Sequence, residues 1–276
     1  METFLPYILF IAGLLALIFG GNWFVDGASS IARRLHIPEV IIGATIVSIG
    51  TTLPEVMVSA DSAFKGHGEI AYGNAIGSII CNTALILAVT MVARIVYVSR
   101  SELILPVICF FAAAFIYVIS AYVFRTFYRI TGILLLVIFV IYIFISLRKS
   151  LIISRAEHKP SDEIKADDKP QGHFGIVKDI VMLIIGAALI ALGANLLVDN
   201  GTIIAERMGV PESVIALTFV ALGTSLPELV TAVVSLIKKH SDLSLGNIVG
   251  ANLFNLVLVS GISVTISPFG VPAGKT

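Results

Sequence analysis

The chain has 276 residues, of which 57% are hydrophobic and 13% charged, with 18 basic and 18 acidic residues and a mean hydropathy of +1.00. Soluble domains carry about 25% charged residues, so this composition excludes an ordinary soluble domain and predicts a membrane protein. The balanced charge, without a basic stripe interleaved with aromatics, argues against nucleic-acid binding. The two cysteines, Cys81 and Cys109, lie in apolar runs and are expected to be free thiols.

Eight apolar runs are long enough to cross a bilayer, which takes about 20 helical residues. They lie at 5–24, 38–63, 70–93, 102–123, 128–147, 177–198, 211–237 and 243–266. The first run lacks the basic start of a secretory signal, so we expect a permanent helix. Between the fifth and sixth runs, from about Arg148 to Lys178, charged residues and prolines predict a solvated linker.

An internal repeat becomes visible when two short motifs are aligned. Gly50-Thr51-Thr52-Leu53-Pro54-Glu55 matches Gly223-Thr224-Ser225-Leu226-Pro227-Glu228 at an offset of 173 residues, the separation of Glu55 and Glu228. The same offset aligns further positions over three spans: Asn22 with Asn195, Asp26 with Asp199, Asn74 with Asn247, Gly77 with Gly250 and Asn82 with Asn255. Chance similarity between apolar helices would not preserve polar positions, so the repeat indicates a duplication.

Five spans separate equivalent points of the two copies, and this odd number places the second copy upside down relative to the first. We therefore predict an all-α integral membrane protein with the inverted-topology repeat fold of many secondary transporters. The first repeat takes residues 1–147 with five spans, the cytoplasmic linker 148–176, and the second repeat 177–276 with three. A complete second copy would reach about residue 321, so about eight of an expected ten transmembrane helices are present and the second repeat is expected to be truncated.

The distribution of Lys and Arg predicts the orientation. With the N-terminus outside, thirteen of the 18 basic residues lie on the inner side and five on the outer side. Because basic residues are retained in cytoplasmic loops, we expect a multi-pass protein of the plasma (inner) membrane, with its N-terminus outside and the long linker in the cytoplasm.

Each motif places a proline beside a glutamate inside an apolar run. Pro54 has no amide hydrogen, and its ring displaces the carbonyl of Gly50, four residues earlier. Backbone carbonyls near Ser48, Gly50 and Thr51 are then free to bind a ligand, which membrane depth allows only beside a cavity or other protein. Glu55 adds a carboxylate, and the two threonines before it add hydroxyls. Oxygen donors of these kinds bind hard cations such as Ca²⁺ and Na⁺.

The following span supplies a complementary polar face. Asn74, Ser78 and Asn82 recur every four residues and so share one side of a helix. Glycines on an adjacent stripe allow close helix contact. In the two repeats these glycines are Gly73 and Gly77, and Gly246 and Gly250, and the second polar face consists of Asn247, Ala251 and Asn255. Two glutamates at the centre of such an assembly would balance one Ca²⁺ or two Na⁺, and mutual exclusion at one site is the simplest basis for exchange.

These motifs closely resemble those of the prokaryotic sodium/calcium exchangers, a branch of the Ca²⁺/cation antiporter superfamily. The resemblance is carried by residues 43–55, 73–82, 223–228 and 246–255, and it covers nearly the whole chain. It implies ten helices in two inverted halves, four ion sites at the centre, and sodium entry that drives calcium out.

The resemblance also implies roles for the motif residues. Glu55 and Glu228 would be the carboxylates shared by calcium and sodium, and Thr51 and Thr224 would give carbonyl and hydroxyl oxygens to calcium. The other implied ligands are the carbonyls of Ser48 and Ala221 and the side chains of Thr52, Ser225 and Ser78 in flanking sodium sites, with Asn82 and Asn255 at the centre. Three positions depart from the family pattern: Asn255 stands where relatives can carry Asp, Ala251 where Ser is expected, and Thr52 replaces Ser. The first two departures affect the expected sodium stoichiometry more than calcium binding.

We therefore expect a secondary active antiporter that exchanges Na⁺ for Ca²⁺ by alternating access at a central site formed by both motifs. The expected partners are the two transported ions and the lipid bilayer, with no cofactor, no nucleic acid and a monomer as the simplest assembly. The open alternatives are exchange of H⁺ for Ca²⁺, K⁺-dependent exchange, and a non-transporting membrane protein whose second half serves packing or assembly. The chain has no HExxH pair, nucleophile motif or paired catalytic Asp, so we expect no enzymatic activity.

Overall fold

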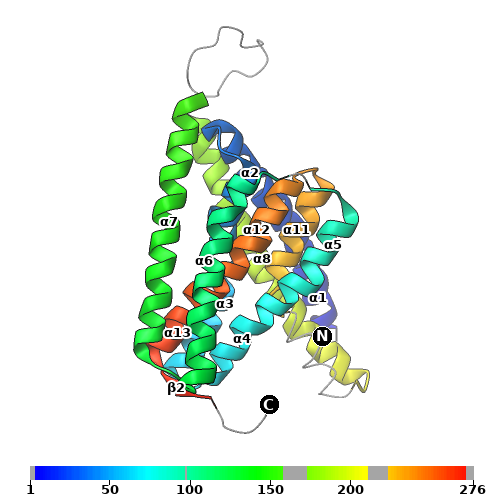
Figure 1. Cartoon of the computed structure of the whole chain (residues 1–276). Helices are drawn as coiled ribbons and strands as arrows, with labels where there is room; N and C mark the ends of the chain where they lie inside the picture. The colour runs from blue at the N-terminus through cyan, green and yellow to red at the C-terminus, as the bar shows by residue number, and fades with distance from the viewer. Residues whose placement is uncertain (1–3, 97, 158–172, 211–222, 272–276) are drawn as a thin grey trace, which may run out of the picture.

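The computed structural model describes residues 4–96, 98–157, 173–210 and 223–271, which are almost entirely helical (Figure 1). Its α-helices are α1 Leu5–Leu35, α2 Glu39–Ile42, α3 Ser48–Phe64, α4 Gly68–Cys81, α5 Leu87–Ala93, α6 Arg100–Val118, α7 Arg129–Glu157, α8 His173–Arg207, α11 Leu226–Ile237, α12 Ser241–Phe254 and α13 Ser260–Ile266. Four π-helices adjoin them: η1 Gly43–Val47, η2 Asn82–Ile86, η3 Ile119–Val123 and η5 Asn255–Val259. Two short strands, β1 Thr126–Phe127 and β2 Phe269–Gly270, form an antiparallel pair.

Seven of the described helices are long and apolar enough to cross a membrane. They cover Leu5–Leu35, Glu39–Phe64, Gly68–Ala93, Arg100–Val123, Arg129–Ser154, Gly175–Arg207 and Ser241–Ile266. The eighth predicted span, 211–237, is described only from residue 223 and contains the short apolar helix α11. The predicted all-α membrane fold is confirmed. The division of the chain into 1–147, 148–176 and 177–276 stays a prediction.

The elements of the two halves have matching bounds at the offset of 173 residues found in the sequence. α4, η2 and α5 cover residues 68–93, and α12, η5 and α13 cover 241–266 with every internal boundary at the equivalent residue. The turns before them match as well, because left-handed Gly66 (φ 82°) corresponds to left-handed Lys239 (φ 67°). The sequence repeat is therefore also a repeat of local structure.

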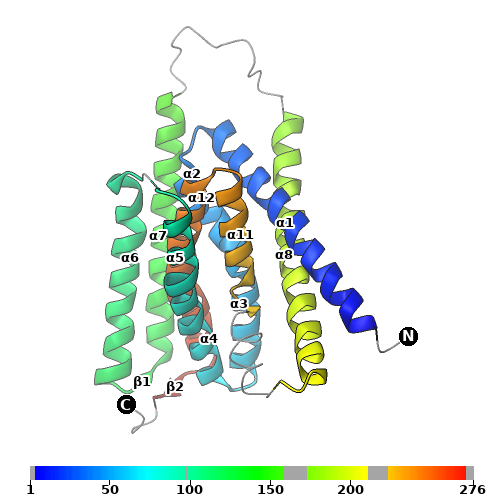
Figure 2. The ribbon, with the colours of Figure 1, turned by 90° about the vertical axis from the view of Figure 1, so that its right-hand side faces the viewer.

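The equivalent segments run in opposite directions through the molecule. In Figure 1, α4 starts at the lower end and α5 ends near the upper end, whereas α12 starts at the upper end and α13 ends at the lower end. The view turned by 90° shows the same opposition (Figure 2). This arrangement is the one predicted from the odd number of spans between the copies.

Helices α1 and α8 pack closely because both carry glycines where they meet. A Cβ atom added to Gly20 would lie 2.9 Å from the carbonyl oxygen of Gly186, and one added to Gly13 would lie 2.9 Å from that of Gly193. Small residues of this kind let membrane helices approach backbone to backbone. At the end of α1, Arg34 forms an ion pair with Asp179 of α8.

The span that contains α12 lies at the centre of the molecule. We compared the buried share of the 18-residue apolar window in each span. It is 72% in the span Ser241–Ile266, 61% in Glu39–Phe64 and 33% or less in the other five. Gly246 and Gly250 of α12 lie directly against Val40 and Ala44, so side chains at these glycines would collide with α2 and η1. The most buried helices therefore bring residues 39–64 of the first half against α12 of the second.

The glycine contact predicted for both repeats is present only on α12 among the described residues. Gly73 and Gly77 of α4 are exposed, and no described atom lies within 4 Å of a Cβ placed on either. On α12, the matching glycines are covered by α2 and η1. The segment that corresponds to α2 and η1 in the second repeat falls within residues 211–222, which lie outside the described residues.

The segment predicted as a linker begins and ends in helix. α7 continues to Glu157, beyond the predicted end of its span at 147, and α8 begins at His173. The hydroxyl of Ser150 donates to the carbonyl of Ser146 at 2.9 Å, and Lys149 donates to a carbonyl of α6. These contacts, together with the apolar residues 151–153, extend the helix beyond the apolar span. Residues 158–172 lie outside the described residues.

Candidate cation-binding site

Glu55 of α3 and Glu228 of α11 lie at the centre of the molecule as buried carboxylates. Both are 0% exposed, and none of their four side-chain oxygens has a hydrogen-bond partner among the described residues. The two carboxylates also interact with each other electrostatically. Burial of an ionised carboxylate without a compensating charge or hydrogen bond is strongly unfavourable. The pair therefore requires positive charge from a bound ion or a proton.

The prolines of the two motifs lie in different local structures. Pro54 is inside α3, which continues through it, so the carbonyl of Gly50 receives no helical hydrogen bond from position 54. Pro227 is in the first turn of α11, where a missing amide hydrogen has no cost. Both prolines line the same small cavity with residues of α1 and α8. Thr224, in the turn before α11, is half-buried.

The hydroxyl residues next to the glutamates in the two motifs are buried. Thr51, Thr52 and Ser225 are at most 2% exposed. The hydroxyl oxygens of Thr52 and Ser225 have no hydrogen-bond partner among the described residues. The Thr51 hydroxyl donates to Oδ1 of Asn247 at 3.2 Å, and its side chain lies beside Glu228. Thr51 thus connects the first motif with two helices of the second half.

Ser48 connects the same halves at the start of α3. Its buried hydroxyl lies 2.7 Å from the carbonyl oxygen of Gly43, 3.0 Å from that of Asn247 and 3.3 Å from Oδ1 of Asn247. The predicted role of the Ser48 carbonyl stays a prediction. The equivalent residue, Ala221, lies outside the described residues, so its role also stays a prediction.

The helices after each motif contribute amide and hydroxyl groups. Ser78 of α4 lies beside Glu55 and has no hydrogen-bond partner among the described residues. Asn82 is 0% exposed, and neither its oxygen nor its nitrogen is paired there. Asn255 donates to the carbonyl of Ala251 at 3.1 Å, while its Oδ1 is unpaired. Both asparagines begin a π-helix, a distortion that is frequent at functional sites.

Near the site, Asn74 lies on the polar face predicted for its helix, whereas the hydroxyl residues Ser59, Thr231 and Ser235 were not predicted from the sequence. Asn74 donates to the hydroxyl of Ser59 at 2.8 Å and to the backbone carbonyl of Glu55 at 3.4 Å. Thr231 and Ser235 of α11 are also fully buried, and their hydroxyls are unpaired among the described residues. Ser59 follows Glu55 by four residues, and Thr231 and Ser235 follow Glu228 by three and seven. This spacing was the signal that could have revealed the three hydroxyls.

The donors at this site are chemically hard. The described residues contain no group of three or more His, Cys, Asp and Glu side chains positioned to hold a metal ion. The site instead combines two carboxylates with hydroxyl, amide and backbone oxygens, and the thiol of Cys81 also lies beside Glu228. Oxygen sets of this kind suit Ca²⁺ and Na⁺, because hard cations prefer carboxylate and carbonyl ligands.

A comparison with protein families identifies the family of the chain. The family model described as sodium/calcium exchanger protein matches residues 5–148 and 178–276, which include both motifs and both polar helices. The chain belongs to the sodium/calcium exchanger family. As a member of this family it is a multi-pass membrane protein of the Ca²⁺/cation antiporter superfamily, and the family resemblance of the motifs is confirmed.

Individual relatives within the family cover most of the chain. Putative antiporter CaxA of Alkalimonas amylolytica is 35% identical over 95% of this chain and 81% of its own length. Sodium/calcium exchanger MaX1 of Methanosarcina acetivorans is 32% identical over 96% of this chain and 84% of its own. Solved structures of the sodium-calcium exchanger NCX_Mj match with a TM-score of 0.80, 31% identity, and coverage of 97% of this chain and 84% of that one.

Proposed function

We propose that this chain exchanges Na⁺ for Ca²⁺ across the membrane by alternating access at the site formed by Glu55 and Glu228. The observation that carries the proposal is the set of four unpaired carboxylate oxygens, two from each repeat, buried together at the centre of the fold. Carboxylates at membrane depth mark ion pathways. The relatives named as sodium/calcium exchangers indicate the ions.

Charge explains why the two ions exclude each other. Two ionised glutamates balance one Ca²⁺ or two Na⁺, so neither ion can join the other at the carboxylates without excess positive charge. A site that is neutral with either ion bound can change the side of the membrane to which it opens, with sodium bound for one change and calcium bound for the other. The empty site would keep two buried charges, and their cost opposes the change from one side to the other. This difference couples the two fluxes.

The neutral oxygens divide between the ions in this proposal. Thr51 and Thr224 supply hydroxyl and carbonyl oxygens to calcium, and Asn82 and Asn255 face the centre. The carbonyls of Ser48 and Ala221 and the side chains of Thr52, Ser225 and Ser78 hold sodium at flanking positions. The unpaired state of Thr52, Ser78 and Ser225 supports this division, because each has an acceptor oxygen available. We also propose the inner membrane as the location, with the N-terminus outside.

The test is ion flux in vesicles that contain the purified chain. Calcium uptake should depend on an opposing sodium gradient and should fall at least a hundredfold in Glu55→Gln and Glu228→Gln, because removal of one carboxylate charge at this burial is worth about 3 kcal/mol or more. Asp61→Asn is the matched control, since Asp61 lies on the same helix with its side chain 63% exposed. This variant should transport like the parent.

Three other results would each replace the proposal. Uptake that ignores sodium and follows a pH gradient would establish H⁺/Ca²⁺ exchange. Uptake that needs potassium together with sodium would establish a K⁺-dependent exchanger. Absence of both calcium uptake and calcium binding by calorimetry would establish a non-transporting membrane protein.

A further inference from the structure

Beyond Glu228, α11 carries two hydroxyls that the proposed ion site does not use. Thr231 and Ser235 follow Glu228 by three and seven residues, so the three side chains share one face of the helix. Both hydroxyl residues are 0% exposed, and neither hydroxyl oxygen has a hydrogen-bond partner among the described residues. Unpaired buried hydroxyls are destabilising, so a purely structural role does not account for them.

The matching part of the first repeat has its buried hydroxyl paired. Position 58, equivalent to Thr231, is a valine, and the hydroxyl beside it belongs to Ser59. Ser59 accepts a hydrogen bond from Asn74 at 2.8 Å, which braces α3 against α4. Asn247, the equivalent of Asn74, is fully buried and leaves its Nδ2 unpaired among the described residues. Among the described residues, buried and unpaired hydroxyls along the helix after the glutamate are therefore found only in the second half.

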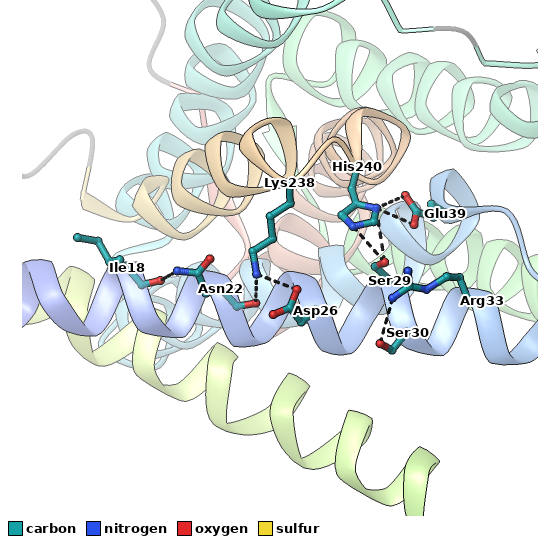
Figure 3. Close-up of polar contacts among 9 residues, drawn as sticks. All are labelled: Ile18, Asn22, Asp26, Ser29, Ser30, Arg33, Glu39, Lys238 and His240. Atoms are coloured by element: carbon teal, nitrogen blue, oxygen red, sulfur yellow. Dashed lines mark hydrogen bonds and ion pairs between the residues drawn. The ribbon is translucent and has the colours of Figure 1, made fainter. Parts of the chain in front are cut away.

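The face of α11 leads to a charged cluster at the end of the molecule. In Figure 3, Lys238 reaches Asp26 of α1 at 2.7 Å, and His240 lies between Glu39 at 2.8 Å and Ser29 of α1. The side chain of Asp26 is 46% exposed, and that of Lys238 is 24% exposed. This end of the molecule therefore carries paired charges of both signs, and part of the Asp26 side chain remains open to solvent.

We propose that Thr231 and Ser235 line a polar route by which a partly hydrated cation passes between Glu228 and the membrane face that carries the Lys238–His240 turn. The inference rests on the proposed function, because the route serves the same site. The hydroxyls replace part of the ion's hydration shell along the way, and the complete burial of both residues means that the route is closed in this conformation. Asp26 and Glu39 form its charged rim.

Cysteine accessibility tests the route. In a background without Cys81 and Cys109, Ser235→Cys should react with a membrane-impermeant methanethiosulfonate from one membrane face, and at least tenfold more slowly once calcium is bound. Lys239→Cys marks that face, because Lys239 is exposed in the same turn. Ser263→Cys is the matched buried control, since Ser263 is 2% exposed and its hydroxyl donates to the carbonyl of Val259 at 2.8 Å. It should not react.

Two labelling results would contradict the proposed route. If Ser235→Cys stays unreactive with sodium, with calcium and without either ion while Lys239→Cys reacts, the route does not exist. Reaction from the opposite face would also overturn it. Because labelling needs no transport, a chain that shows reaction at Ser235→Cys but no sodium-dependent uptake would contradict the proposed function and leave the route standing.

A flux measurement tests the hydroxyls themselves. Thr231→Val combined with Ser235→Ala removes both oxygens at nearly constant volume, and should slow maximal calcium uptake about tenfold with the half-saturating calcium concentration unchanged. Ser263→Ala, which also loses one buried hydroxyl, should retain the parent rate. An unchanged maximal rate in the double variant would overturn the assignment, and a changed half-saturating concentration alone would place the hydroxyls in the binding site.

Discussion

Asn247 joins the two repeats at the level of single atoms. Its Oδ1 accepts from Thr51 at 3.2 Å, and both its Oδ1 and its backbone carbonyl lie within 3.3 Å of the Ser48 hydroxyl. Since Thr51 also lies beside Glu228, one amide fixes the orientation of a hydroxyl that faces the carboxylate of the opposite repeat. The position of Thr51 in the site therefore depends on a residue of the other half.

Replacement of Asn247 should weaken calcium binding. Asn247→Ala removes the amide oxygen that accepts from the Thr51 hydroxyl at 3.2 Å, a loss of about 1–3 kcal/mol for a buried group. The Ser48 hydroxyl keeps the carbonyl of Gly43 as an acceptor. We expect an increase of about tenfold in the calcium dissociation constant by calorimetry. Asn252→Ala is the control, because Asn252 lies on the same helix and its amide donates to the hydroxyl of Thr83 at 3.0 Å. Equal effects of the two changes would contradict the role of Asn247.

At the residue scale the sequence predicted the groups that cost most to bury. Glu55 and Glu228 stood out because a carboxylate in an apolar run needs compensation, and both are fully buried at the centre. Thr231 and Ser235 were missed, because an isolated hydroxyl in a membrane helix can bond to its own backbone and gives no signal by itself. Only the structure shows that theirs do not.

At the scale of helices, equivalent glycines have different surroundings. Gly250 of α12 lies directly against Ala44 and the Ser48 hydroxyl, whereas its equivalent, Gly77 of α4, is exposed with no described atom nearby. Tight packing of α12 on η1 and α3 holds Asn247 against Ser48 and Thr51. The close approach of these helices is thus a condition for the geometry of the site.

A methyl group at these two positions should have opposite consequences. Gly250→Ala forces atoms of Ala44 and Ser48 apart and should destabilise the fold by about 1–3 kcal/mol. Gly77→Ala adds a better helix former to an open surface and should be neutral or slightly stabilising. Both effects can be measured by heating the protein in detergent and recording how much monodisperse protein remains at each temperature. Equal loss of stability would show that the exposed face of α4 is also packed.

The sequence predicted helices by length and apolarity, and it was less informative about where they end or bend. Seven spans agree with described helices because about 20 apolar residues leave few alternatives in a bilayer. The π-helices at Asn82 and Asn255 were not predicted, since one displaced hydrogen bond leaves the apolar pattern almost unchanged. The extension of α7 to Glu157 was missed because charged residues there continue a helix into solvent instead of ending it.

At the scale of the whole molecule, the buried carboxylates connect ion binding to stability. The two glutamates come from opposite repeats, and when both are ionised their mutual repulsion pushes the halves apart unless a cation lies between them. A bound ion therefore acts as a bridge across the interface of the repeats. A ligand that binds only the folded state stabilises it in proportion to the logarithm of its concentration.

Calcium should accordingly protect the chain against heat. At a hundred times its dissociation constant, a ligand adds about 2.7 kcal/mol to the free energy of unfolding, and we expect a rise of several degrees in the melting temperature in detergent. Sodium should give a smaller rise and reduce the effect of calcium by competition. In the variant with both Glu55→Gln and Glu228→Gln the calcium response should vanish. A rise that survives in this variant would place the stabilising calcium elsewhere.

The π-helices η2 and η5 bear on the origin of the repeat. A π-turn is equivalent to one extra residue inserted into an α-helix, and such an insertion is a single genetic change. η2 and η5 begin and end at equivalent residues, Asn82 with Asn255 and Ile86 with Val259. Two independent insertions at one position are less simple than a single one that was later copied. The matched bounds are therefore explained most simply by a bend that was present in one half and copied with it.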